Sequence, residues 1–125
     1  MLNQILFYIG AVFVTIWGIA HLFPTKNVVR DFGDITTDNR NIITMEWINE
    51  GISLIFIGVL VALVTMIDRS ASVSMAVYGA SVVMLLVLAV ISLFTGFKVN
   101  FLPFKLCPLI FTVAAVLITA GMFIR

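Results

Sequence analysis

Few side chains in this sequence could do chemistry, and a simple helical arrangement can bring three of them together. They are the single histidine, His21, and two glutamates, Glu46 and Glu50. Residues four positions apart lie on the same face of a helix, so the two carboxylates are expected to stack. One imidazole and two carboxylates could bind zinc, iron or manganese, or could relay protons or cations. They could also hold the polar head of a lipid or quinone whose tail lies between helices.

Each of these residues also has a purely structural interpretation. His21 would then be an ordinary residue at a membrane surface, and Glu46 would be the last solvated residue before an apolar segment. Glu50 would form a buried ion pair with a basic residue. The possible counter-ions are Arg30, Arg40 and Lys105. Both a ferritin-like di-iron site and a haem held by two histidines need more ligands than this chain offers, so the catalytic residues and any cofactor stay unassigned.

The neighbours of these residues extend them to a candidate polar cluster. Asn49 lies at the edge of the stripe that Glu46 and Glu50 define, and Asn39 and Ser53 lie further along it. Such a stripe is too polar for lipid contact, so it is expected to face the protein interior or water. The candidate cluster comprises His21, Arg40, Glu46, Asn49 and Glu50.

Composition shows what kind of protein positions these residues. Apolar residues make up 62% of the 125 residues, charged residues make up 10%, and the mean hydropathy is +1.23. A soluble domain is about 45–50% apolar and about 25% charged, so a soluble globular enzyme and a disordered tail are excluded. The net charge of +1 gives no field that would bind nucleic acid. The chain is expected to be a small integral membrane protein in a lipid bilayer.

Four apolar runs predict an all-α, four-helix transmembrane bundle that forms one domain over residues 1–125. A helix needs about 20 residues to cross a hydrocarbon core about 30 Å thick, and each run is long enough. The spans are predicted near residues 3–23, 42–67, 72–96 and 104–124. Spans one and two are antiparallel neighbours, so His21 at the end of one and Glu46 and Glu50 at the start of the other lie at the same membrane level.

The polar loop at residues 24–41 holds six of the thirteen charged residues. Within it, Val28, Val29 and Phe32 lie on one helical face, which predicts a short helix lying in the membrane interface. Thr25 is expected to cap the start of this helix and Gly33 to end it. An irregular polar loop is the alternative.

The second span has its own start signal and a packing face. Thr37 or Asp38 is expected to cap the helix that runs into it. Gly51, Gly58 and Ala62 form a face of small residues, separate from the polar stripe, that suits close helix packing.

The remaining polar residues of the spans are sparse. Ser92 and Thr95 end the third span on the side of the polar stripe, so one half of the bundle is expected to be polar and the opposite half dry. Cys107, beside Pro108, is the only cysteine, which excludes an internal disulfide. It is interpreted as a packed residue, with a redox-active thiol as the alternative.

Basic residues predict the orientation in the membrane. With four spans, five of the seven lie on the side of the long loop and two lie on the side of the termini. Basic residues concentrate in cytoplasmic loops, so the long loop is predicted to be cytoplasmic and both termini outside. The five are Lys26, Arg30, Arg40, Lys98 and Lys105, and the two are Arg69 and Arg125.

The first half of the chain resembles a known group of proteins. The residues Gly18-Ile-Ala-His21, which end the first span, resemble the small DoxX-like bacterial membrane proteins. The segment NIITMEWINEG, residues 41–51, is similar to a stretch of uncharacterised bacterial four-span proteins. The resemblance implies a four-helix bundle in a bacterial inner membrane, in a group associated with quinone-linked oxidation, and it transfers no catalytic residue. Small multidrug transporters carry a glutamate in span one, which this chain lacks.

Three functions remain open on these grounds. The favoured one is an accessory or binding subunit of a larger membrane assembly, because the chain is small and its chemistry sparse. The second is a redox subunit that uses a quinone, a lipid or a metal at His21, Glu46 and Glu50. The third is an oligomeric small transporter or proton relay. A homo-oligomer or membership of a membrane complex is expected, with no nucleic-acid partner.

Overall fold

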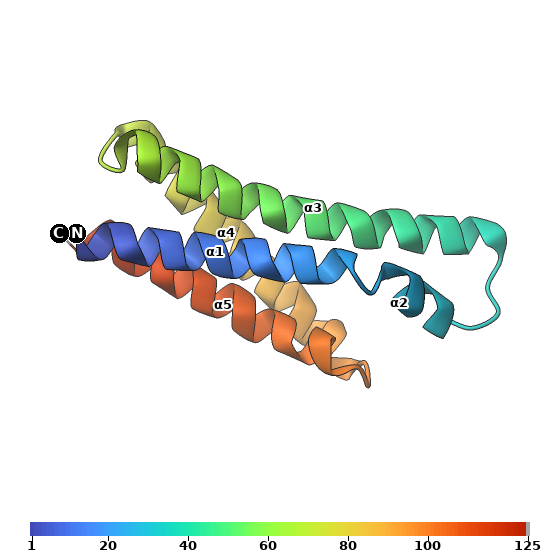
Figure 1. Ribbon diagram of the computed structural model, residues 1–125. Coiled ribbons are helices and arrows are strands. Elements are labelled where there is room, and N and C mark those ends of the chain that lie inside the picture. The colour runs from blue at the N-terminus through green and yellow to red at the C-terminus, as the bar shows by residue number, and fades with distance from the viewer. Residues whose placement is uncertain (125) are drawn as a thin grey trace.

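A computed structural model describes residues 1–124 and is all-helical over that range, with no strand, which confirms the predicted fold class. The elements are α1 (Leu2–Leu22), α2 (Thr25–Asp31), α3 (Thr37–Asp68), α4 (Ser72–Phe94), the 3-10 turn η1 (Gly96–Lys98) and α5 (Leu102–Phe123). Helices α1, α3, α4 and α5 are long and apolar enough to cross a membrane, whereas α2 lies in the first connection. The four long helices run side by side, and both ends of the chain lie at the same end of the bundle (Figure 1).

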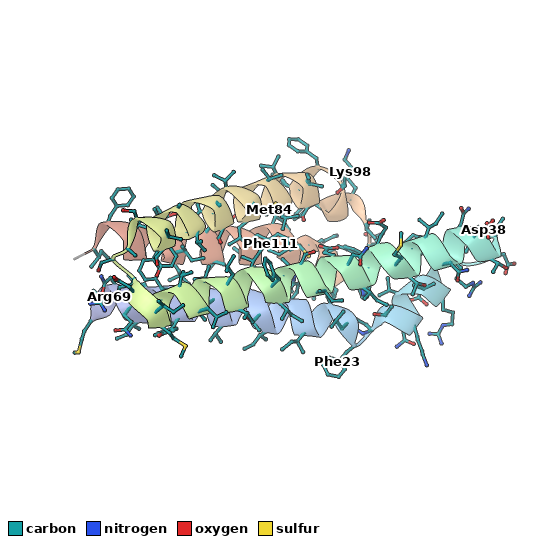
Figure 2. All side chains as sticks on the ribbon, turned by 90° about the horizontal axis from the view of Figure 1, so that it is seen from above. Phe23, Asp38, Arg69, Met84, Lys98 and Phe111 are labelled. Carbon is teal, nitrogen blue, oxygen red and sulfur yellow. The ribbon has the colours of Figure 1, made fainter. Side chains whose placement is uncertain are left out.

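Helix α3 begins earlier than predicted because its capping residue lies earlier in the chain. The N-cap is Thr36 rather than Thr37 or Asp38, and its hydroxyl accepts a hydrogen bond from the Asn39 N–H at 3.2 Å. The 32 residues of α3 correspond to about 48 Å of helix, against a hydrocarbon core of about 30 Å. The first turns of α3 therefore extend past the other long helices, and Asp38 lies at their far end (Figures 1 and 2).

The short helix predicted in the first connection is present as α2. Its two valines, Val28 and Val29, are buried, and the helix packs against the first part of α3. Phe32, which was expected to share their face, follows the end of the helix and is exposed. The apolar face of α2 is thus covered mainly by the protein itself.

The boundaries of α2 agree with the prediction at one end only. Gly33 ends the helix as expected: its φ is +76°, and its N–H donates to the Arg30 carbonyl at 3.0 Å. The predicted start is wrong, because Pro24 occupies the N-cap position. The Thr25 hydroxyl instead donates to the Leu22 carbonyl at 2.7 Å and so ties α2 to the end of α1.

The four long helices do not pack equally closely. Helix α1 packs against both α3 and α5, and α4 packs against α5, whereas the contact between α3 and α4 is much smaller. The fully buried side chains lie where α1, α3, α4 and α5 converge, and Phe111 is labelled among them in Figure 2. They include Phe7, Val14, Leu54, Val61, Tyr78, Leu85, Phe111 and Ile118. The weak α3–α4 contact leaves the bundle open along one side.

Glycines set the close approach of α1 and α3. A Cβ atom added at Gly18 would lie 2.7 Å from the Gly51 carbonyl oxygen, and one added at Gly58 would overlap the Thr15 hydroxyl and the Ala11 carbonyl. The two backbones are therefore in direct contact, as the small-residue face of the second span predicted. The contact fixes α1 and α3 relative to each other beside the candidate site.

The structure provides two exposed positions, one at each end of the bundle, at which the predicted orientation can be tested by labelling. The loop before α3 and the η1 turn lie at one end of the bundle, and the Arg69 turn lies at the other end; Arg125 is outside the described residues. In a Cys107→Ala background, an impermeant thiol reagent is expected to label Ser70→Cys in intact cells, and Asp34→Cys only after the membrane is opened. Both positions are exposed. The reverse labelling pattern would invert the topology.

Candidate functional site

His21 lies in the last turn of α1 and is enclosed by aromatic rings. Its side chain is only 5% exposed. The imidazole stacks on the indole of Trp47, with ring centres 4.7 Å apart, and meets the edge of Trp17 at 5.9 Å. The indole N–H of Trp47 donates to the His21 backbone carbonyl at 2.5 Å. Residues of α1 and α3 therefore hold the histidine in one orientation.

Glu50 is the acidic partner of this histidine, as the sequence predicted. Its Oε1 lies 3.6 Å from Nε2 of His21, and its side chain is 36% exposed. This distance is within the range of an ion pair, but Nε2 makes no hydrogen bond within residues 1–124. The pair thus consists of a buried nitrogen with free hydrogen-bonding capacity and a carboxylate that reaches the surface.

A small cavity lies beside the histidine, at the end of the bundle where α1, α3 and α5 meet. Its volume is about 120 Å³, and aromatic residues form most of its wall. Trp17 contributes a second buried nitrogen, Nε1, that has no hydrogen-bond partner within residues 1–124. The wall also includes Trp47, Phe104 and Cys107. Because the Trp17 indole also lies within weak hydrogen-bond reach of the Cys107 thiol, Nε2 of His21 is the buried nitrogen here that a polar group could satisfy.

The other polar residues of α3 lie in an open groove and not in the bundle interior. Glu46, Asn49 and Ser53 are all exposed, and with Glu50 they line the gap between α3 and α4. The groove has a volume of about 500 Å³. Its other walls are the apolar side chains Phe32, Ile42, Met84, Leu88 and Phe104. Glu50 borders both this groove and a second hollow that reaches Cys107, so it stands between the groove and the histidine.

The remaining members of the predicted cluster do not join the pair. Arg40 is exposed and makes no ion pair within the described chain, and the carboxylate partner of Arg30 is Asp31, at 3.7 Å. The suggestion that Arg30, Arg40 or Lys105 balances Glu50 is therefore wrong; His21 is its neighbour. Within residues 1–124 no three His, Cys, Asp or Glu side chains lie close enough together to hold a metal ion.

The other end of the bundle is not dry, contrary to expectation. The Thr65 hydroxyl donates to the Val61 carbonyl at 2.7 Å, so the Tyr78 hydroxyl, 2.8 Å away, donates to Thr65. The Ser74 hydroxyl donates to the Asp68 carbonyl at 2.5 Å. Serine, threonine and tyrosine inside apolar spans were the available signal, and the sequence reasoning passed over them. Ser81, one turn further along α4, adds another buried hydroxyl.

Cys107 has the packed environment that was predicted for it. It is 3% exposed, and its thiol donates to the Pro103 carbonyl with a sulfur–oxygen distance of 3.4 Å. Its position in the wall of the cavity was not anticipated. The thiol thus contributes a soft, weakly polar surface beside the histidine.

Comparison of the chain with protein-family models, with curated proteins and with solved structures finds no match. The DoxX-like resemblance therefore remains a prediction, and any function has to be argued from the geometry of the site.

Proposed function

We propose that the protein is a membrane-embedded binding subunit that holds the polar head of an apolar-tailed molecule at His21 and Glu50. The observation that carries this proposal is the Nε2 atom of His21, which is buried, free of hydrogen bonds and 3.6 Å from a carboxylate. An unsatisfied buried polar atom costs about 1–3 kcal/mol, and a ligand head would remove that cost.

The level of the site in the membrane supports this role. His21 lies in the last turn of α1 and Glu50 lies beside it on α3, so we place the pair at the depth of the lipid head groups. From there the groove between α3 and α4 runs along the lipid-facing surface past Met84 and Leu88. The polar head of the ligand would then lie at His21 and Glu50, and its apolar tail would lie in the groove. This match of polarity holds for a quinone as well as for a lipid.

Removal of either member of the pair is expected to release the ligand. After purification and detergent exchange, organic extracts of the wild type should contain an apolar-tailed molecule at near-stoichiometric amounts by mass spectrometry. His21→Leu and Glu50→Leu are expected to retain about tenfold less, since each removes a hydrogen bond that involves a buried or charged group. Tyr78→Phe, at the far end of the bundle, should retain it fully. Equal retention in all four proteins would contradict the proposal.

The protruding end of α3 supports membership of a larger membrane assembly. Beyond the bundle, α2 and the first turns of α3 present exposed charges, among them Lys26, Arg30, Asp38 and Arg40. Within the described residues, these charges make no ion pair between α2 and α3. A partner subunit or a second copy with complementary charge would fit this surface, and cross-linking in native membranes through Asp38→Cys tests it.

A further inference from the structure

We propose that the ligand head is a primary ammonium group, so that the physiological ligand is an aminolipid. This inference rests on the proposed function and specifies the chemical class of its ligand. It follows from the charge of the groove, the unpaired Nε2 of His21 and the shape of the path for the tail.

The charge at the head end of the groove is negative. Glu46 and Glu50 both line it, and the only His, Lys or Arg nitrogen within 4 Å of either carboxylate in residues 1–124 is Nε2 of His21, which is charged only when the imidazole is protonated. No lysine or arginine of the described chain lies within ion-pair distance of either carboxylate. A cation is therefore the complementary ligand charge at this level.

The hydrogen-bonding groups select among cations. A neutral His21 that carries its proton on Nδ1 presents the lone pair of Nε2, beside the acceptor oxygens of Glu50. A primary ammonium has three N–H donors and can serve both residues at once. A quaternary ammonium has no N–H and would leave Nε2 unpaired in its buried position.

Aromatic side chains pack around His21 and limit the access of water to its imidazole. Trp47 and Phe104 meet edge to face beside His21, with ring centres 5.4 Å apart. The cavity of about 120 Å³ lies on the His21 side and the groove lies on the Glu50 side, and the two atoms that would bind the ammonium, Nε2 and Oε1, are 3.6 Å apart.

The groove between α3 and α4 provides the path for the tails. It is open along its length because these two helices make little contact, and Met84 and Leu88 form its apolar side. A soluble amine would gain nothing from this surface. The occupant that uses both ends of the groove is a lipid with an amine head.

Native mass spectrometry of the purified protein with lipids of identical tails tests this inference. Dioleoyl phosphatidylethanolamine and dioleoyl phosphatidylcholine differ only in the three methyl groups on nitrogen, and dioleoyl phosphatidylglycerol has no amine. We expect the ethanolamine lipid to bind about tenfold more tightly than either of the others. Glu50→Gln should abolish the preference, and Asp34→Asn, an exposed acid in the loop at the same end, should keep it. Glycerophosphoethanolamine, the same head without tails, should not compete.

The outcomes separate the two proposals. Saturable binding that is equal for the three lipids, or equal for the ethanolamine and choline lipids, would overturn the ammonium assignment and leave the proposed function standing. Competition by the tail-less head would overturn the assignment to a lipid. No saturable binding of any of these lipids, together with no ligand retained by the wild type, would overturn both.

Discussion

Replacing Gly58 with valine is expected to separate α1 from α3 and to lower the free energy of unfolding by about 3 kcal/mol, the upper part of the usual range for an overpacked core. A Cβ atom at this position would overlap the Thr15 hydroxyl and the Ala11 backbone carbonyl. Neither atom can move aside easily, because the Thr15 hydroxyl donates to that same carbonyl at 2.8 Å. Unfolding of the protein in lipid bicelles by SDS, followed by circular dichroism, measures the loss.

Gly79 supplies the matched control. It also lies inside a long helix, but nothing is within 4 Å of an added Cβ atom. Gly79→Ala is expected to leave the stability unchanged or to raise it by about 0.5–1 kcal/mol, because alanine restricts the unfolded chain more than glycine does. If Gly58→Val unfolded at the same SDS fraction as the wild type, the direct backbone contact between α1 and α3 would be refuted.

Replacing Tyr78 with alanine is expected to have the second large effect on stability. The ring is fully buried and stacks on Phe7 with ring centres 3.9 Å apart. In water a Phe-to-Ala change in a core costs about 3–5 kcal/mol, part of it from lost transfer out of water. In a bilayer lipid replaces water around the unfolded spans, so only the packing contribution is lost and about 2–3 kcal/mol is expected. The same SDS unfolding experiment measures it.

Tyr78→Phe separates the ring from its hydroxyl. It keeps the stack on Phe7 and removes the hydrogen bond to Thr65, whose own hydroxyl still donates to the Val61 carbonyl. Hydrogen bonds between membrane helices contribute about 0.6 kcal/mol on average, so the loss should be near that value. A loss for Tyr78→Phe as large as that for Tyr78→Ala would show that the hydrogen bond, and not the packing of the ring, stabilises this end.

The helices could be predicted from the sequence because an apolar segment long enough to cross a membrane has to be helical to satisfy its backbone hydrogen bonds. Apolar runs of about 20 residues predict spans whatever their contacts, and all four were found. The start of α3 was missed by a few residues because Thr36, Thr37 and Asp38 can all cap a helix. Which of them does so depends on the path of the preceding loop, which the sequence does not specify.

The pairing of His21 with Glu50 could be predicted because it depends on membrane level alone. Which face of each helix meets its neighbour depends on the rotation of the helices, and apolar residues surround these spans almost uniformly. For that reason the sequence left open whether Glu46 and Asn49 face the protein interior or water, and the structure exposes both in the groove. The aromatic enclosure of His21 was missed because it combines Trp17, Trp47 and Phe104 from three helices.

Helix α3 runs without a kink from its projecting turns in the aqueous phase into the membrane-spanning bundle. Between Thr37 and Glu50 it contains neither glycine nor proline, so nothing in that stretch favours a bend. A force applied to its projecting turns outside the bilayer would therefore reach the carboxylate of Glu50 as a rotation or tilt of one rigid rod. The glycine contacts with α1 begin at Gly51, next to Glu50, so such a tilt would pivot at the level of the site. The length of α3 thus lets its projecting turns meet an aqueous partner while the contact between α1 and α3 holds the spacing of His21 and Glu50.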